Sequence, residues 1–189
     1  MNKKYITVVI LAAGKSVRIG KDKMLLPLRK KTVVECTVEP YLSLADEIII
    51  VTGKNNEELI NLFKNIEKIK LIHNQRDDSE MIDSLKLGLS EAHGEIIFIT
   101  PGDYPVVKRD TIEIMSKLEY DSIIPSHNGR KGHPIIISSE MKKLVLEREY
   151  ESLRDFLKEI DYFIFETSDI GILKDVDTLE DYYEILKRC

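Results

Sequence analysis

Residues 8–14 of the chain, VVILAAG, run directly into a basic stretch at residues 15–23, KSVRIGKDK. The run of Val, Ile and Leu is apolar on both faces, which is typical of a strand that is covered by helices on each side. Small residues and a glycine follow this strand, and they let the backbone turn and come close to a ligand. The stretch therefore predicts an α/β fold whose first strand ends in a binding loop.

Three more short apolar runs, at residues 48–51, 71–72 and 96–99, repeat the pattern of the first strand. The longer segments between these runs look helical. Alternating strands and helices imply right-handed crossovers, and they predict a mostly parallel, Rossmann-like sheet in a three-layer α/β/α sandwich. Ligands of such sheets bind beyond the carboxyl ends of the strands, so the residues just after each strand are the candidates for function.

Three of the helical segments carry clear sequence signals. Thr32 and Glu35 form a capping-box pattern at the start of one helix. A second helix has an apolar stripe, and a third has both an apolar stripe and a capping residue, Thr178. The stripes consist of Ile82, Leu85 and Leu89 on the second helix, and of Leu179, Tyr182, Tyr183 and Leu186 on the third. We expect the members of each stripe to share one face of their helix.

The composition is that of an ordinary globular protein, because 43% of the 189 residues are hydrophobic and 32% are charged. We expect one domain, residues 1–189. The formal net charge of -5 argues against nucleic acid as the main partner. Cys36 and Cys189 form neither a metal-ligand pattern nor a disulfide framework, which suits a reducing cytoplasm. The apolar run at residues 6–13 is too short for a membrane span, so we expect a cytoplasmic protein with no membrane partner.

The loop after the first strand has the composition of a phosphate-binding cradle. Successive backbone N–H groups of small residues can surround phosphate oxygens, and Arg18 and Lys23 would add positive charge beside them. The spacing of a P-loop and the dinucleotide fingerprint Gly-x-Gly-x-x-Gly are both absent from the sequence. The alternative to a cradle is a polar connection with a basic cluster on the surface.

A carboxylate follows the fourth strand, in the segment TPGDYP at residues 100–105. Asp103 stands near the carboxyl edge of the sheet, close to where the first loop should open. A carboxylate there can bind magnesium together with phosphate oxygens. Taken alone, Gly102, Asp103 and the flanking prolines also make a good turn. The first loop and this segment together favour a metal site.

Residues 174–178, KDVDT, end another short strand in this interpretation. Asp175 and Asp177 are two positions apart and would share one face of that strand, so one of them could complete the metal site. The alternative is that Asp177 and Thr178 only form the N-terminus of the last helix, where Asp is favoured in any case.

These pieces, in this order, resemble the MobA-like nucleotidyltransferase family, and within it the molybdenum cofactor cytidylyltransferases. The similarity runs over almost the whole chain. Its most specific motif spans residues 11–23, LAAG and then Arg-x-Gly-x-x-Lys, and shorter motifs at residues 101–105, 132–134 and 175–178 add support. The resemblance implies a fold of the nucleotide-diphospho-sugar transferase type and a single nucleotidyltransferase domain.

The resemblance also implies roles for individual residues. The nucleotide would be held by Leu11, Ala12, Ala13, Gly14, Arg18, Lys23 and Gly102 and, at the base and ribose, by the segment from Asn74 to Ser84. Asp103 would bind Mg²⁺, helped by Asp175 or Asp177, and would be catalytic together with Arg18 and Lys23. Gly132, His133 and Pro134 would lie on the acceptor side, although sequence alone also favours His133 as part of a tight turn.

Family members with LAAG and PGD look like CTP users, so the resemblance predicts CTP as the donor. It also predicts molybdopterin as the acceptor and a molybdenum hydroxylase as a further partner. The chain departs from the family at two places. Glu80 stands where Gly is usual, and Ile82 and Asp83 stand where small residues are common. Residues 149–154 keep only the arginine of an acceptor-side motif.

In the expected reaction, the acceptor phosphate attacks the α-phosphorus of the triphosphate and pyrophosphate leaves. A phosphate monoester needs no general base near neutral pH, so catalysis rests on alignment and on neutralising charge. We expect Lys23→Ala and Asp103→Ala to lower turnover with little loss of fold. The alternatives are a nucleotidyltransferase for a sugar or polyol phosphate, and a non-catalytic accessory factor for the maturation of a molybdenum enzyme.

Overall fold

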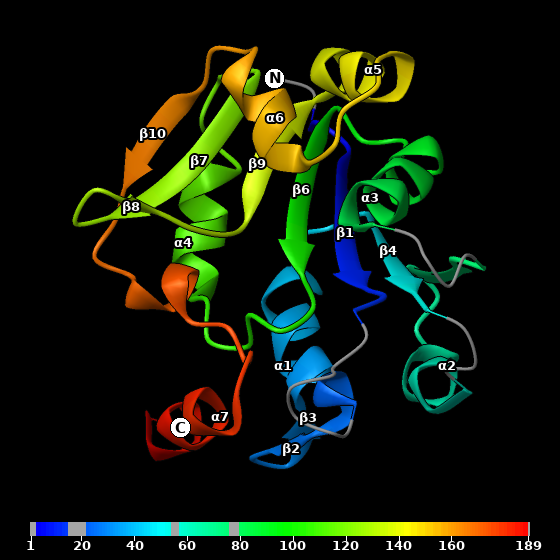
Figure 1. The fold of residues 1–189 in the computed structure, drawn as a ribbon, viewed down its shortest axis with the longest axis vertical. Coiled ribbons are helices and arrows are strands. Elements are labelled where there is room, and N and C mark those ends of the chain that lie inside the picture. The colour runs from blue at the N-terminus through cyan, green and yellow to red at the C-terminus, as the bar shows by residue number, and fades with distance from the viewer. Residues whose placement is uncertain (1–2, 15–21, 54–56, 76–79, 189) are drawn as a thin grey trace.

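The computed structural model describes residues 3–14, 22–53, 57–75 and 80–188. Within these residues the central sheet has eight strands, in the order β10-β7-β9-β6-β1-β4-β5 with β8 paired to β7 (Figure 1). The strands are β1 (Ile6–Ala12), β4 (Glu47–Thr52), β5 (Ile69–His73), β6 (Ile96–Pro101), β7 (Ser122–His127), β8 (Arg130–Lys131), β9 (Ile135–Ser138) and β10 (Phe163–Glu166). The four apolar runs that predicted strands lie in β1, β4, β5 and β6.

Most neighbouring strands of the sheet are parallel. The pairs of β1 with β4, β1 with β6, β4 with β5 and β7 with β10 are all parallel, whereas β9 is antiparallel to both β6 and β7. A parallel pair needs a crossover, and the helices supply it. The prediction of a mostly parallel, Rossmann-like sheet is therefore confirmed.

Helices cover both faces of the sheet, which explains why its strands are apolar on both faces. Alternate residues of β1 show the division, because Val8 and Ile10 belong to one core while Val9 and Leu11 belong to the other. The first core is closed by α1 (Val33–Val38), α2 (Glu57–Phe63) and α4 (Arg109–Met115), and the second by α3 (Met81–Ser90), α5 (Ser139–Glu147) and α6 (Leu153–Lys158). The result is the three-layer α/β/α sandwich (Figure 1).

The predicted capping box and the first predicted apolar stripe are both confirmed. At the start of α1, Thr32 and Glu35 form the capping box, with the Thr32 N–H donating to Glu35 Oε2 at 2.7 Å. In α3 the stripe residues Ile82, Leu85 and Leu89 are all buried. Helix α3 also lies very close to the sheet, since a Cβ on Gly88 would stand 2.6 Å from the side chain of Val9. Glycine is required there because no side chain fits between α3 and β1.

A third, smaller core lies beyond the carboxyl edge of the sheet. Here α7 (Leu179–Arg188) packs against α1 and the short hairpin of β2 (Pro27–Leu28) and β3 (Lys31–Thr32), and the buried residues are Leu28, Val33, Cys36, Val176, Tyr182 and Ile185. Thr178 caps α7 by accepting from the Asp181 N–H at 3.1 Å, as predicted. The predicted stripe on α7 is wrong in part. Leu179, Tyr183 and Leu186 are exposed, because the contact is narrow and buries only Tyr182 with Ile185.

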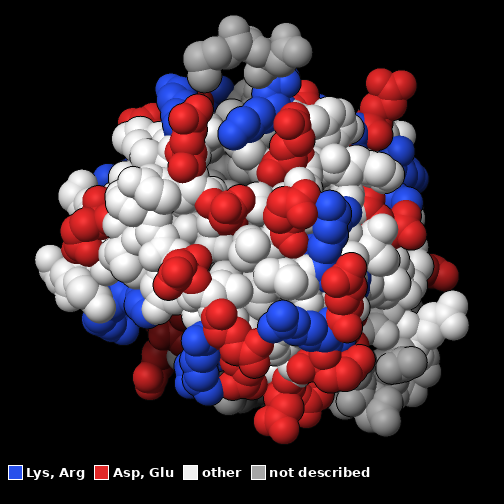
Figure 2. All heavy atoms as spheres, turned by 90° about the horizontal axis from the view of Figure 1, so that it is seen from above, with Lys and Arg blue, Asp and Glu red and all other residues white. Residues whose placement is uncertain are grey.

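The opposite end of the molecule, where the parallel strands begin, is a charged surface. Figure 2 looks onto this end and shows acidic and basic side chains interspersed between uncharged ones. Neither sign of charge forms one continuous field there. Among the described residues, no helix is both long and apolar enough to cross a membrane.

Candidate active site

The candidate site lies where the carboxyl ends of β1 and β6 meet. The two strands are parallel neighbours, with Leu11 opposite Pro101, and the Gly102 N–H donates to the Leu11 carbonyl at 2.9 Å. From β1 the chain crosses to β4 on one side, whereas β6 lies on the other side. Such a reversal of strand order opens a crevice beyond the strands, which is the usual ligand site of open α/β sheets. The topology thus brings the first loop and the Asp103 segment together, as predicted.

Only the two ends of the first loop belong to the described part of the chain. Ala13 and Gly14 follow β1, and a Cβ added to Gly14 would meet no described atom within 4 Å. At the other end Lys23 opens the 3₁₀ helix η1 (Lys23–Leu25), which Asp22 caps by accepting from the Met24 N–H at 3.0 Å. The predicted phosphate ligand Arg18 lies outside the described residues.

Lys23 and Asp103 form the central ion pair of the site. The Lys23 ammonium contacts Asp103 Oδ2 directly and Asp177 Oδ1 at 3.4 Å. The side chains of Lys23 and Asp103 are only 12% and 9% exposed, so water screens the pair weakly. Burial by itself lowers the pKa of Lys23, but the bonds and charges of Asp103 and Asp177 outweigh it and raise that pKa. Lys23 is therefore a fixed positive charge between two carboxylates.

The segment at residues 174–177 reaches this pair without forming the predicted strand. It follows the 3₁₀ helix η3 (Ile170–Leu173) as an extended piece of chain. The Val176 N–H donates to the Asp103 carbonyl at 2.9 Å and ties the segment to the Asp103 loop, with the Val176 side chain buried. The prediction of a strand is wrong because the segment has no neighbouring strand to pair with among the described residues. Asp177 nevertheless lies close to Lys23, with Oδ1 at 3.4 Å from the ammonium.

Tyr104 is a member of the site that sequence reasoning missed. Burial raises its pKa first, and the negative charges of Asp175, Asp103 and Asp177 raise it further, so the phenol is held in its neutral form. Asp175 behaves in the same way, because burial and the neighbouring acids raise its pKa. The only sequence signal for Tyr104 was its position directly after Asp103.

The carboxylates suit a divalent cation that has few protein ligands. Asp103 Oδ1 is buried and has no hydrogen-bond partner among the described residues, so within them it is an acceptor oxygen without a donor. Within the described residues, however, no three His, Cys, Asp or Glu side chains come together as a metal-ligand cluster. Mg²⁺ usually takes one or two carboxylates and fills its other positions with water and substrate phosphate. Asp103, with Asp177 near by, fits that manner of binding.

The predicted acceptor segment meets Asp103 through Tyr104. The rings of His133 and Tyr104 pack edge to face, with their centroids 5.0 Å apart. The segment is anchored on η3, because the His133 N–H donates to the Ile172 carbonyl at 2.9 Å. A Cβ on Gly132 would stand 2.1 Å from the same carbonyl oxygen, so only glycine fits there. The His133–Pro134 peptide bond is cis.

His133 is half-buried, and the low exposure of its ring disfavours the charged form. Burial lowers its pKa to about 4, although a hydrogen bond to the backbone of Ile99 opposes the shift. Its Nδ1 atom is buried without a hydrogen-bond partner. We therefore expect a neutral ring near pH 7, with one nitrogen that has no hydrogen-bond partner among the described residues.

Because of His133, the stability of the protein is expected to fall as the pH drops from about 6.5 to about 4. In that range the unfolded chain takes up a proton on His133 and the folded chain does not, so protons favour unfolding. One pKa unit corresponds to about 1.4 kcal/mol, which makes the loss on the order of 3 kcal/mol. Urea unfolding of wild type and His133→Asn between pH 7.5 and 4.5 measures this loss in the free energy of unfolding.

The variant should lose less stability than wild type over this interval. His73→Asn, at the exposed end of β5, serves as the control and should follow the wild-type curve. Equal losses for His133→Asn and wild type would show that the His133 ring is protonated in the folded state well above pH 4.

The segment predicted to meet the base and ribose is only partly within the described residues. Its two ends, Asn74 and Ser84, are buried and joined, with Asn74 Nδ2 donating to Ser84 Oγ at 2.9 Å. The unusual acid Asp83 accepts from the Glu80 N–H at 3.0 Å at the start of α3, and Ile82 lies on the buried face of the same helix. Asp83 therefore caps the helix, which explains an acid at this position.

Two supporting residues had no sequence signal at all. Thr37 Oγ1, on α1, donates to the Gly102 carbonyl at 2.9 Å and holds the Asp103 loop against the first core. Asp169 is buried and accepts from the N–H groups of Lys108 and Gly171 and from Thr111 Oγ1, which fixes η3 beneath the Gly132 segment. Thr37 and Asp169 bond to residues that are far from them in the chain, so no local sequence pattern predicts these contacts.

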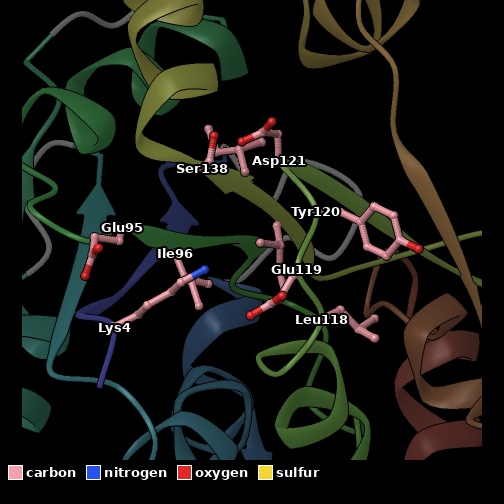
Figure 3. A pocket seen from close by; sticks show the side chains of 10 residues that line it. Lys4, Glu95, Ile96, Leu118, Glu119, Tyr120, Asp121 and Ser138 are labelled. Atoms are coloured by element: carbon pink, nitrogen blue, oxygen red, sulfur yellow. The ribbon is translucent and has the colours of Figure 1, made fainter. Parts of the chain in front are cut away.

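A separate hollow of about 470 Å³ lies at the other end of the sheet, where β6 begins (Figure 3). It is lined by Lys4, Glu95, Ile96, residues 118–121 and residues 136–138. None of the predicted site residues lines it. The hollow and the Lys23–Asp103 site are therefore distinct, because β6 runs from one to the other.

Known proteins share much of this sequence and fold. A family model described as the MobA-like NTP transferase domain matches residues 8–163. The chain is 31% identical over 185 residues to the molybdenum cofactor cytidylyltransferase of Escherichia coli (strain K12), covering 97% of this chain and 96% of that protein. It is 29% identical over 192 residues to a probable molybdenum cofactor guanylyltransferase of Natranaerobius thermophilus, covering 95% and 90% of the two chains. A nucleotidyl transferase from Methanothermobacter thermautotroptrophicus superimposes with a TM-score of 0.84 at 25% identity, covering 97% of each chain.

Proposed function

The chain belongs to the MobA-like NTP transferase family, and on that basis we propose that it transfers CMP from CTP to molybdopterin with the help of Mg²⁺. Family membership makes it an enzyme, a nucleotidyltransferase. The relatives named for molybdenum cofactor cytidylyl and guanylyl transfer support a molybdopterin-related acceptor. The relative named for cytidylyl transfer, together with the LAAG and PGD motifs, supports CTP as the donor.

The observation that carries the proposal is the buried Asp103 with its unpartnered Oδ1 atom, beside Lys23 at the carboxyl edge of β1 and β6. A pure scaffold has no use for a desolvated carboxylate at this place, because burying a charge is costly unless something is gained. Asp103, with Asp177 or Asp175, would hold Mg²⁺. Bound there, Mg²⁺ would neutralise charge on the phosphate oxygens of the nucleotide.

The remaining residues divide between the two substrates. On the nucleotide side, Lys23 and Arg18 would contact phosphates, and close backbone approach would come from Leu11, Ala12, Ala13, Gly14 and Gly102. Asn74 and Ser84 would lie near the base and ribose. On the acceptor side, Gly132, His133 and Pro134 would bind the pterin phosphate through the neutral His133 ring and the backbone.

The reaction needs no protein base. An oxygen of the acceptor phosphate attacks the α-phosphorus in line, and a new P–O bond forms. The bond from the α-phosphorus to the bridging oxygen of the β-phosphate breaks, and pyrophosphate leaves with that electron pair. The chain contributes alignment and positive charge, which are the main terms in phosphoryl-type transfer.

Pyrophosphate release from CTP, GTP, ATP and UTP with Mg²⁺ tests the proposal, with and without molybdopterin that carries molybdenum. Release that requires both CTP and the pterin is the expected result. Release with GTP instead would keep the reaction and overturn the choice of donor. Release only with a sugar phosphate or polyol phosphate from a parallel panel would overturn the acceptor. Nucleotide binding without any release would point to a non-catalytic accessory factor.

A further inference from the structure

Lys23 has two sets of partners that cannot be satisfied at once. In the structure its ammonium contacts Asp103 Oδ2 and Asp177 Oδ1. In the proposed function the same ammonium serves nucleotide phosphates, and the same carboxylates serve a divalent cation. Both duties require that the ion pair between Lys23 and Asp103 opens.

The burial of the pair explains why it forms in the first place. The Asp103 side chain is 9% exposed, and a carboxylate removed from water needs a positive charge close to it. Lys23 supplies that charge, and its contact with the 40% exposed Asp177 joins a second carboxylate to the same ammonium. The ammonium thus stands between two carboxylates, as a cation that is bound by both would stand.

The backbone around Lys23 does not need to move for the pair to open. Asp22 caps η1, and Met24 is buried with its sulfur near Gly102, so the main chain of this short helix is held in place. The lysine side chain is a flexible four-carbon stem with a compact charge at its end. Rotation of that stem alone can carry the ammonium from the carboxylates toward the crevice.

We propose that in the ligand-free protein Lys23 Nζ occupies the place of the divalent metal ion between Asp103 and Asp177. Nucleotide phosphates give Lys23 a new partner, and its departure frees the carboxylates for the cation. Metal and nucleotide then bind tightly only together, because a divalent cation and an ammonium repel each other strongly at one position. This inference rests on the proposed function and adds the order in which the site is filled.

The coupling is reciprocal, as any linkage between two ligands must be. Metal weakens the hold of Asp103 on Lys23 and so favours nucleotide, and nucleotide favours metal. Removing the ammonium removes the competitor. A variant without it should bind a divalent cation tightly even when no nucleotide is present.

Mn²⁺ binding to the full chain, followed by electron paramagnetic resonance of the free ion, tests this without any turnover. Without nucleotide, Lys23→Met is expected to bind Mn²⁺ roughly 5–150-fold more tightly than wild type. Lys70→Met is the matched control, because it removes the same charge from the exposed Lys70–Glu91 pair, and it should bind like wild type. Equal or weaker binding by Lys23→Met than by wild type would overturn the inference.

Failure of the metal site itself gives a different result. The double variant with Asp103→Asn and Lys23→Met should lose the increase in Mn²⁺ affinity that Lys23→Met alone is expected to show. If the double variant still binds Mn²⁺ tightly, the cation lies elsewhere and the metal assignment in the proposed function is wrong. If wild type already binds Mn²⁺ as tightly as Lys23→Met, the metal assignment survives and the placeholder role of Lys23 is wrong.

Lys23→Met removes the ammonium from beside the buried Asp103 carboxylate, so the folding of this variant needs a separate measurement. Lys23→Gln keeps a hydrogen-bond donor at this position and serves as the second variant. Mn²⁺ should raise the thermal midpoint of either variant more than that of wild type, since a ligand of the folded state stabilises it. A variant that melts early and gains nothing from Mn²⁺ would contradict the inference.

Discussion

Replacing Asp103 by asparagine is expected to lower the turnover number for CTP-dependent pyrophosphate release by about 10²–10³-fold, the usual cost of losing one electrostatic contact of a transition state. Asparagine keeps the shape of the side chain and removes its charge. Asp103 Oδ1, now buried without a partner, would become an oxygen or an amide nitrogen with little affinity for a cation. Steady-state kinetics at several Mg²⁺ concentrations measure the effect.

Asp110→Asn is the control for this experiment. Asp110 is an exposed acid in the first turn of α4, and its loss changes the net charge equally. Its turnover should stay near that of wild type. Normal turnover in Asp103→Asn, with the variant shown to be folded by circular dichroism, would remove Asp103 from the proposed metal site.

The second large effect concerns stability. Lys23→Met is expected to lower the free energy of unfolding by about 3–5 kcal/mol, because removal of one member of a buried ion pair strands the other. Asp103→Leu should cost less than Lys23→Met, since Lys23 keeps its contact with Asp177 at 3.4 Å. The double variant should cost less than the sum of the two, because no buried charge remains unpaired. Urea unfolding of wild type, the two single variants and the double variant measures these free energies as a double-mutant cycle.

The exposed pair of Lys31 and Glu39 serves as the control, in a second double-mutant cycle of the same design. Its side chains are 41% and 53% exposed, so Lys31→Met and Glu39→Leu should couple by less than about 1 kcal/mol. Additive costs at Lys23 and Asp103 would mean that each side chain finds water or another partner when the other is removed. In that case the pair would not hold the site together.

This cycle also changes an expectation drawn from the sequence. There, Lys23→Ala and Asp103→Ala are expected to cause little loss of fold, with Lys23 interpreted as a phosphate ligand and Asp103 as a metal ligand. The two side chains are nearly buried and bonded to each other, so each substitution is now expected to cost stability as well as rate. Activity measurements on these variants therefore need a folding control.

The sheet and the helix caps could be predicted because their signals are local. An apolar run such as residues 48–51 and a cap such as Thr32 with Glu35 lie within a few residues, and the structure confirms both. The position of the site also followed from the sequence, because the carboxyl ends of parallel strands meet at one edge. Local patterns failed at α7, where a narrow contact left Leu179 and Tyr183 exposed.

The inner arrangement of the site could not be predicted for a different reason. Lys23 and Asp103 are 80 residues apart, and each was given a ligand of its own. The sequence shows two groups of opposite charge, but only the fold shows that they meet and neutralise each other. Tyr104 and Thr37 could not be predicted for the same reason, because each contributes to the site through contacts with residues that are distant in the chain.

The hydrogen bond from the Val176 N–H to the Asp103 carbonyl also has a consequence for how the enzyme is made. Every described strand of the main sheet lies within residues 6–166, so each of these strands leaves the ribosome before Asp177 does. Lys23 and Asp103 can meet at that stage. Asp177 can join them only after it has left the ribosome in its turn, so the strands of the sheet are available for folding before the site is complete.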